Sequence, residues 1–361
     1  MVKAPSNIAF TKYWGKRDFK INLPNNGSIS MTLDENVSTK TAILFSKDFK
    51  TDYLYINNEV QDIHSQQIPE KLKFIKQILD EMKQKANLES NVHCLIYSEN
   101  SFPSSAGIAS SASGAIALSF ALTNALEFNL KQNEISIIAR RISGSGCRSI
   151  YGGFVEWKKG INQDGSDSYS IQLKDEKFWP ELRDIIVIVD ASAKKISSSI
   201  GHEATVKTSA LYKSRPDFVE NEENPKLRNA ILGRDFETMA KVIMQDSNSL
   251  HAVMLDTWPP IIYLNDSSKE IIYDVLELNN KYNKTIAGYT FDAGPNAHII
   301  TTEKYSNEII NIIKNDPNIK LKEIIISKPG TGPKLIKDKE MENKILSIYN
   351  DLKSKQKTKE R

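Results

Sequence analysis

The sequence predicts an α+β protein with two domains, and three observations favour this fold class. Short β-like runs open the chain, and the last third, residues 267–327, alternates helical and β-like patterns. The length of 361 residues is enough to bury the core of one large or two ordinary domains without disulfide or metal staples. We therefore predict an N-terminal domain at residues 1–190 and a C-terminal domain at residues 191–361.

The N-terminal half is predicted to begin with strands and to continue with helices. The β-like run D-Y-L-Y-I-N-N-E-V at residues 52–60 contains an Asn57-Asn58 pair, which is typical of a hairpin turn. Residues 68–86 carry apolar side chains at helical spacing with a proline near the start, so they predict an amphipathic helix. The other predicted elements are strands at 28–33 and 92–97 and a buried helix of small residues at 106–126.

The C-terminal half is predicted to alternate helices and strands after one irregular segment. Residues 185–190 are an apolar run that predicts a buried strand. Residues 215–226 are polar and contain two prolines, so they predict a linker or a long loop. The charged tail after Lys334 predicts a solvated helix with a frayed end. The remaining elements are helices at 267–280 and 306–315 and strands at 285–291, 296–301 and 321–327.

Composition argues against several classes of function. The 48 Lys and Arg residues nearly balance the 45 Asp and Glu residues, so the net charge of +3 predicts no nucleic-acid partner. The 2 cysteines lack zinc-site or disulfide spacing, and the 5 histidines form no close pair typical of a metal site. No run approaches the roughly 20 apolar residues that span a bilayer, and the first residues do not resemble a signal peptide. We therefore expect a cytoplasmic protein with no membrane insertion and no metal site.

A loop of small residues, F-P-S-S-A-G-I-A-S-S-A-S-G, precedes and begins the predicted helix at 106–126. Backbone N–H groups at the start of such a helix can bind an anion, helped by the helix dipole. The loop has neither the G-K-[ST] of a Walker A motif nor a GxGxxG fingerprint. On composition alone, a Ser- and Ala-rich helix packed in a core is the favoured alternative. The candidate phosphate ligands are Ser104, Gly107, Ser110 and Ser111.

Four segments between residues 4 and 297 carry a resemblance to a known family. They are A-P-S-N-I-A-F-T-K-Y-W-G-K-R-D, S-E-N-S-F-P-S-S-A-G-I-A-S-S-A-S-G, S-G-S-G-C-R-S-I-Y-G-G-F-V-E-W and T-F-D-A-G-P-N-A. In this order they resemble the GHMP kinase superfamily, and within it the mevalonate diphosphate decarboxylase branch. The resemblance implies a GHMP fold, with an N-terminal domain like domain 2 of ribosomal protein S5, a ferredoxin-like C-terminal domain and a site in the cleft between them. It also implies a homodimer.

The resemblance implies a carboxy-lyase that acts on a phosphorylated mevalonate in isoprenoid biosynthesis. Such a site needs cations for the phosphates, donors for the carboxylate and one fixed negative group near the developing positive charge. The family pattern assigns the 5-phosphate end of the substrate to Tyr13, Lys16, Ser143 and Ser145. Without the motif, Lys16 would be a solvated surface charge and S-G-S-G would be a turn.

The family pattern also assigns groups at the reacting end of the substrate. Arg148 resembles the arginine that holds the substrate carboxylate and phosphate with a bidentate fork, and Asn7 would orient Arg148 or the substrate. Asp292 matches the catalytic aspartate, and its alternative role is an Asx turn before Gly-Pro. Ser198 matches a serine near the 3-oxygen, and its alternative role is an N-cap.

The cofactor prediction depends on departures from the family pattern. In G-H-E-A-T-V-K-T-S, His202 replaces a methionine associated with the adenine side of the cleft, Lys207 reverses a charge, and Ser199 replaces an arginine found in some bacterial relatives. We therefore expect ATP-independent decarboxylation of mevalonate 3,5-bisphosphate to isopentenyl phosphate, with no cofactor. The first alternative is an ATP- and Mg-dependent diphosphomevalonate or phosphomevalonate decarboxylase, giving isopentenyl diphosphate or isopentenyl phosphate. A remote alternative is a non-catalytic ligand sensor on the same scaffold.

Overall fold

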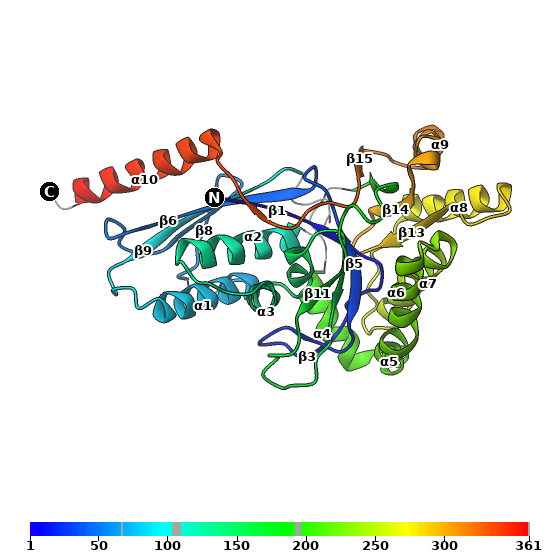
Figure 1. Ribbon diagram of the computed structural model, residues 1–361, viewed down its shortest axis with the longest axis horizontal. Helices are drawn as coiled ribbons and strands as arrows, with labels where there is room; N and C mark the ends of the chain where they lie inside the picture. The colour runs from blue at the N-terminus through cyan, green and yellow to red at the C-terminus, as the bar shows by residue number, and fades with distance from the viewer. Residues whose placement is uncertain (66–67, 103–109, 191, 193–195, 360–361) are drawn as a thin grey trace.

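The computed structural model describes residues 1–65, 68–102, 110–190, 192 and 196–359. Three larger sheets and one strand pair are arranged along the long axis of the molecule, with helices against them (Figure 1). In the described part of the chain, no helix has both the length and the apolar character that a membrane span requires. The mixture of sheets and helices confirms the predicted α+β class.

The first sheet has six strands in the order β16-β1-β6-β9-β7-β8. Asn57 and Asn58 connect β7 to β8 with φ values of 50° and 67°, the left-handed conformation that a two-residue hairpin turn requires, so the predicted hairpin is confirmed. The strands are β1 (Val2–Pro5), β6 (Ser38–Ser46), β7 (Tyr53–Ile56), β8 (Glu59–Gln61), β9 (His93–Asn100) and β16 (Lys334–Leu335).

Both faces of this sheet are covered. On one face, Cys94 and Ile96 of β9 pack toward the predicted amphipathic helix α1, which the structure confirms with slightly shorter bounds. On the other face, Leu95 and Tyr97 pack against the C-terminal helix α10 (Figure 1). This alternation is the period-2 pattern of a strand buried on both sides. The helices are α1 (Glu70–Lys85), α2 (Ser110–Ala125), α3 (Gln132–Ile142) and α10 (Lys339–Lys359).

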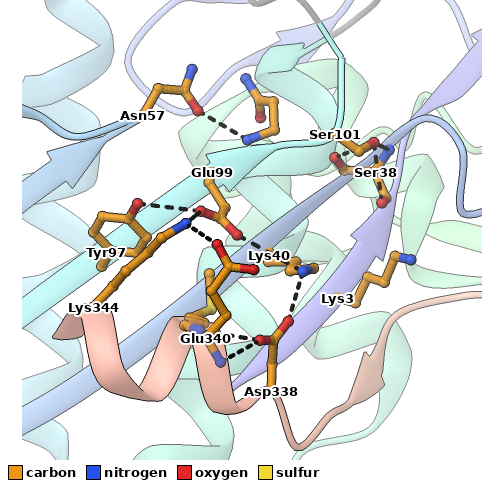
Figure 2. Close-up of polar contacts among 12 residues, drawn as sticks. Lys3, Ser38, Lys40, Asn57, Tyr97, Glu99, Ser101, Asp338, Glu340 and Lys344 are labelled. Carbon is orange, nitrogen blue, oxygen red and sulfur yellow. Dashed lines mark hydrogen bonds and ion pairs between the residues drawn. The ribbon is translucent and has the colours of Figure 1, made fainter. Parts of the chain in front are cut away.

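The C-terminal helix is docked, so the prediction of a solvated tail is wrong for its first half. Met341 is fully buried against the sheet. Around this apolar contact, the Lys40 ammonium lies 2.6 Å from Asp338 Oδ2 and the Lys344 ammonium lies 3.0 Å from Glu99 Oε2 (Figure 2). Composition alone concealed the docking, because the charged residues that dominate the tail frame a narrow apolar face.

The second sheet carries the segments that build the candidate site. Its strand order is β11-β10-β5-β2. The short strand pair β3-β4 follows the edge strand β2 along the sequence. Ser143, the first residue of the S-G-S-G-C-R motif, is the N-cap of the 3₁₀ helix η1 (Gly144–Ile150), which contains the rest of the motif and precedes β10. The strands are β2 (Asn7–Ala9), β3 (Lys16–Asp18), β4 (Leu23–Pro24), β5 (Ser28–Thr32), β10 (Phe154–Trp157) and β11 (Ser170–Lys174).

The third sheet has the order β13-β14-β12-β15, with every neighbouring pair antiparallel. Helix α8 directly precedes β13 and α9 lies between β14 and β15, so the sheet has the ferredoxin-like order and that prediction is confirmed, with α4 to α7 as additional helices between β12 and α8. The elements are β12 (Leu182–Ile188), α8 (Asp266–Lys281), β13 (Ala287–Phe291), β14 (Ala297–Thr302), α9 (Glu303–Asn315) and β15 (Glu323–Ser327).

The first and third sheets do not divide at the predicted domain boundary. Strand β12 pairs within the third sheet although it precedes the predicted boundary after residue 190. Strand β16 and helix α10 return to the first sheet from the C-terminal end. One core cluster joins the second and third sheets, with Ile8 and Phe154 packed in the same cluster as Ile186 and Ile300. The boundary between residues 1–190 and 191–361 therefore stays a prediction.

The segment predicted as a loop at residues 215–226 is helical, so that prediction is wrong. Pro216 and Pro225 each lie in the first turn of a helix, where a missing N–H costs nothing. The long helix that follows was not predicted at all. The elements are α4 (Ser198–Thr208), η2 (Leu211–Lys213), α5 (Arg215–Phe218), the π-helical η3 (Val219–Glu223), α6 (Asn224–Gly233) and α7 (Phe236–Leu255).

Met341 should contribute strongly to stability if α10 is part of the folded core. We expect Met341→Ala to lower the free energy of unfolding by about 2–4 kcal/mol, because it leaves a cavity between helix and sheet. Leu346 on the same helix is 43% exposed, so Leu346→Ala should change stability by less than about 0.5 kcal/mol. Urea denaturation of both variants measures this, and equal losses would show that α10 does not dock as described.

Candidate active site

A buried ion pair joins the N-terminal segment to the third sheet. Asp292 follows β13, and its Oδ1 atom accepts a 2.7 Å hydrogen bond from the Lys12 ammonium, which also donates to the Ala9 carbonyl oxygen at 2.8 Å. The Lys12 side chain is 3% exposed and the Asp292 side chain is 30% exposed. Burial alone would raise the pKa of Asp292, but the charge and hydrogen bond of Lys12, with smaller contributions from His298 and Arg148, together lower that pKa to about 2. Asp292 is therefore a carboxylate at neutral pH.

The turn after Asp292 leaves its carboxylate directed to a cation. The backbone N–H of Gly294 donates to the carbonyl oxygen of Asp292 at 2.7 Å, so the main chain closes the turn. The Oδ1 atom is held by Lys12. This geometry differs from the Asx-turn alternative, in which a side-chain oxygen would cap the turn.

Arg148 is buried and held by neutral groups. Its Nε atom donates to Asn7 Oδ1 and one terminal nitrogen donates to Ser28 Oγ, both at 3.1 Å. The Asn7 amide in turn donates to Ser149 Oγ at 2.8 Å and to the Ser145 carbonyl oxygen at 3.1 Å. Burial lowers the pKa of Arg148, while the Asp292 charge acts in the opposite direction. In the part of the chain that the structure describes, Arg148 forms no ion pair, so its charge is available for an anionic ligand.

Tyr13 packs against the turn that holds the two predicted serine ligands. A Cβ atom on Gly144 would lie only 2.7 Å from the Tyr13 ring, so this close approach requires glycine. Ser143 and Ser145 flank that glycine, with their hydroxyl oxygens 3.4 Å apart. Among the described residues the Tyr13 hydroxyl is buried without a hydrogen-bond partner. Burial raises its pKa well above the usual value, so the hydroxyl remains a donor for a ligand.

His202 fixes the segment that carries the predicted phosphate ligands. Its Nδ1 atom accepts a 2.7 Å hydrogen bond from the backbone N–H of Gly15. Its ring stacks on Trp14 at 4.2 Å between centroids and lies 4.6 Å from the Tyr13 ring. Burial and the nearby Lys16 charge lower the pKa of His202 well below 6.5, so the ring is neutral and Nδ1 can accept. Helix α4 therefore holds the N-terminal segment in place through this histidine.

Three buried cations, Lys12, Lys16 and Arg148, lie in the segments that carry the predicted site residues. Lys16 is 6% exposed, and burial lowers its pKa. Its ammonium lies 5.2 Å from the centre of the Phe19 ring, and among the described residues it forms no ion pair. Lys12 and Arg148 are the other two cations, and the charge of each lowers the pKa of Asp292. This excess of positive charge is suited to a substrate with several negative groups.

The remaining predicted residues lie at the edge of this cluster or outside the described chain. Ser198 is exposed at the first position of α4, one turn before His202, while Ser197 caps the helix. Ser111 is half-buried in the first turn of α2, which begins at Ser110. The other two phosphate-loop candidates, Ser104 and Gly107, lie outside the described residues.

Lys12 is the functional candidate that sequence reasoning missed. It is the first lysine of T-K-Y-W-G-K, whereas the family pattern assigns a ligand role to the second lysine, Lys16. No sequence pattern distinguishes the two, because only the fold brings Lys12 to Asp292, 280 residues away. No group of three His, Cys, Asp or Glu side chains arranged for a metal ion occurs in the described ranges.

Comparison with known proteins finds the same family over both halves of the chain. Residues 4–170 match the diphosphomevalonate decarboxylase-like N-terminal domain, and residues 184–320 match the mevalonate 5-diphosphate decarboxylase C-terminal domain. The diphosphomevalonate decarboxylase of Saccharomyces cerevisiae is 44% identical over 300 residues, which cover 82% of this chain and 76% of that protein.

Two solved structures add information on ligands. The mevalonate diphosphate decarboxylase from Enterococcus faecalis, described with a mevalonate diphosphate mediated ATP binding mechanism, has a TM-score of 0.81 and 30% identity over 93% of this chain and 98% of its own. A further structure in complex with MVAPP, AMPPCP and magnesium has a TM-score of 0.82, 30% identity and the same two coverages. The chain therefore belongs to the mevalonate 5-diphosphate decarboxylase family of carboxy-lyases, within the GHMP superfamily that its four sequence segments predict.

Proposed function

We propose that this chain is an ATP-dependent decarboxylase of mevalonate 5-diphosphate that forms isopentenyl diphosphate, carbon dioxide, ADP and phosphate. The observation that carries the proposal is the Asp292 carboxylate, held ionised by Lys12 within electrostatic range of the free charge of Arg148. Family membership of both halves of the chain supports the same activity.

The prediction of an ATP-independent mevalonate 3,5-bisphosphate decarboxylase is wrong, and so is the prediction that no cofactor is used. The similar proteins are diphosphomevalonate decarboxylases, and one solved relative holds AMPPCP, an ATP analogue, with magnesium. The first alternative, which uses ATP and Mg, replaces both predictions.

Two of the three departures from the family pattern are explained by contacts within the protein. They were therefore misleading as evidence against the use of ATP. His202 bonds to the Gly15 amide and stacks on Trp14, so it supports the substrate segment from α4. Lys207 lies on the exposed side of the same helix and pairs with Glu203 four residues earlier at 2.5 Å. Nothing in the structure explains the serine at position 199.

The diphosphate end of the substrate would lie against Tyr13, Lys16 and the turn at Ser143 and Ser145. Lys16 supplies charge from a buried position without a competing ion pair in the described chain. The Tyr13 hydroxyl and the two serine hydroxyls supply donors. These groups bind and orient the substrate but do not take part in bond breaking.

Arg148 and Asp292 would act at the reacting end. Arg148, oriented by Asn7 through a 3.1 Å hydrogen bond, holds the substrate carboxylate. After the 3-hydroxyl is phosphorylated and the phosphate leaves, carbon 3 becomes electron-poor and carbon dioxide departs to form the double bond. A carboxylate with a pKa of about 2 is a weak base, so Asp292 contributes mainly as a fixed negative charge beside that carbon.

The nucleotide would bring its magnesium with it, since Mg²⁺ commonly binds through substrate phosphates and keeps several waters. Ser111 in the first turn of α2 offers a hydroxyl beside the positive end of the helix dipole. Ser104, Gly107 and Ser110 complete the proposed phosphate loop, and Ser198 is proposed near the 3-oxygen. A homodimeric state and a cytoplasmic location are carried forward as proposals from the sequence.

The direct test supplies purified protein with mevalonate 5-diphosphate and follows carbon dioxide release. We expect release with Mg-ATP, one ADP formed per carbon dioxide, and none when nucleotide or magnesium is omitted. Release that is independent of ATP, or no release with Mg-ATP, would refute the proposed function.

Asp292→Asn should abolish most of the activity without unfolding the protein. The amide keeps the size of the side chain but removes the negative charge, so we expect kcat to fall on the order of 10³-fold. Substrate affinity should change much less. The matched control is Asp266→Asn, because the Asp266 side chain is 93% exposed at the first position of α8. Near-normal turnover of Asp292→Asn would assign Asp292 a structural role only.

A further inference from the structure

Two adjacent residues in the middle of α7 accept hydrogen bonds from the two segments that carry Lys12 and Asp292. Asp246 Oδ2 accepts a 2.6 Å hydrogen bond from the backbone N–H of Lys12. Ser247 Oγ accepts a 3.0 Å hydrogen bond from the backbone N–H of Phe291, the residue before Asp292. Asp246 is fully buried and Ser247 is 1% exposed. One turn of one helix therefore contacts the main chain of both segments that meet in the site.

The helix is itself fixed close to the strand that ends at Asp292. A Cβ atom on Gly288 of β13 would lie 3.0 Å from the Ala240 Cβ atom of α7, so the helix and strand backbones approach closely. Asp235 caps the start of α7 by accepting from the Thr238 amide at 3.1 Å. Close packing of this kind transmits small displacements instead of absorbing them.

Asp246 forms a buried ion pair with Arg215 through its other carboxylate oxygen. Its Oδ1 atom accepts a 2.7 Å hydrogen bond from Arg215, and both side chains are almost completely buried. Burial and the Asp246 charge raise the pKa of the nearby Glu223 to about 9, so Glu223 is neutral at pH 7. Asp246 Oδ1 thus pairs with Arg215, while Asp246 Oδ2 accepts the hydrogen bond from the Lys12 backbone N–H.

We propose that Asp246 and Ser247 are positioning residues that set the distance between Lys12 and Asp292. Their hydrogen bonds go to the backbone amides of Lys12 and Phe291, so they act on the site through these two segments. They act by holding two backbone amides at a fixed spacing, so that the Lys12 ammonium stays within hydrogen-bonding range of the Asp292 carboxylate. The expected effect on turnover rests on the proposed decarboxylase function, whereas the effect on the ion pair does not.

Ser247→Ala tests the proposal with a minimal change in shape. We expect kcat to fall about 10-fold with KM changed less than about 2-fold, because a small displacement of Asp292 affects the transition state more than substrate binding. Tyr289→Phe is the matched control, since it removes a 3.1–3.2 Å hydrogen bond between Asn248 of the same helix and the same strand. This control should retain full kcat.

A second readout does not depend on activity. Carbon-detected NMR of the Asp292 carboxyl should show its pKa raised toward the usual 3.8 in Ser247→Ala and unchanged in Tyr289→Phe. The other charged or titratable groups that act on this carboxyl are Lys12, Arg148, His251 and His298, and both variants retain them.

Three outcomes separate the proposals. Inactive wild-type protein with a raised Asp292 pKa in Ser247→Ala would refute the decarboxylase function and support positioning. Active wild-type protein with an unchanged kcat and an unchanged Asp292 pKa in Ser247→Ala would overturn positioning alone. A kcat loss equal to that of Tyr289→Phe would also overturn it, because any helix–strand hydrogen bond would then have the same effect.

Discussion

The Lys12–Asp292 ion pair is the interaction on which the rest of the site depends. A buried carboxylate without a partner would take up a proton, because burial opposes charge. At Asp292, Lys12 is the largest of the influences that reverse this tendency, and it acts with His298 and Arg148 to keep the carboxylate ionised. The pair also joins segments 280 residues apart, so the geometry of the site is a property of the whole fold. Either residue alone in this position would be destabilising.

The architecture explains how that pair is held. The second and third sheets share one core cluster, in which Ile8 of β2 and Ile186 of β12 pack with Ile243 of α7. Helix α7 also lies close to β13, the strand before Asp292, where Gly288 approaches Ala240. Helix α7 contributes hydrogen bonds to both segments, and α4 supports the neighbouring residues through His202. The first sheet lies at the other end of the molecule and is completed by the returning C-terminal helix (Figure 1).

Sequence patterns predicted local features better than long-range ones. The Asn57-Asn58 turn and the amphipathic helix near residues 68–86 depend on short-range chemistry, and both were predicted correctly. Two prolines suggested a loop at 215–226, because a proline that starts a helix has the same composition signal as one that ends it. Family motifs led to Asp292, but Lys12 was missed because its partner is set by tertiary packing. His202 was misinterpreted for the same reason.

Lys12 helps to hold Asp292 as a carboxylate in the folded protein. The most direct measurement is the pKa of the Asp292 carboxyl group, followed by carbon-detected NMR in the wild type and in Lys12→Met. We predict a value of about 2 in the wild type, below the usual 3.8, and a clearly higher value in Lys12→Met, where burial acts without its largest counter-charge. The same pKa in both proteins would contradict the account.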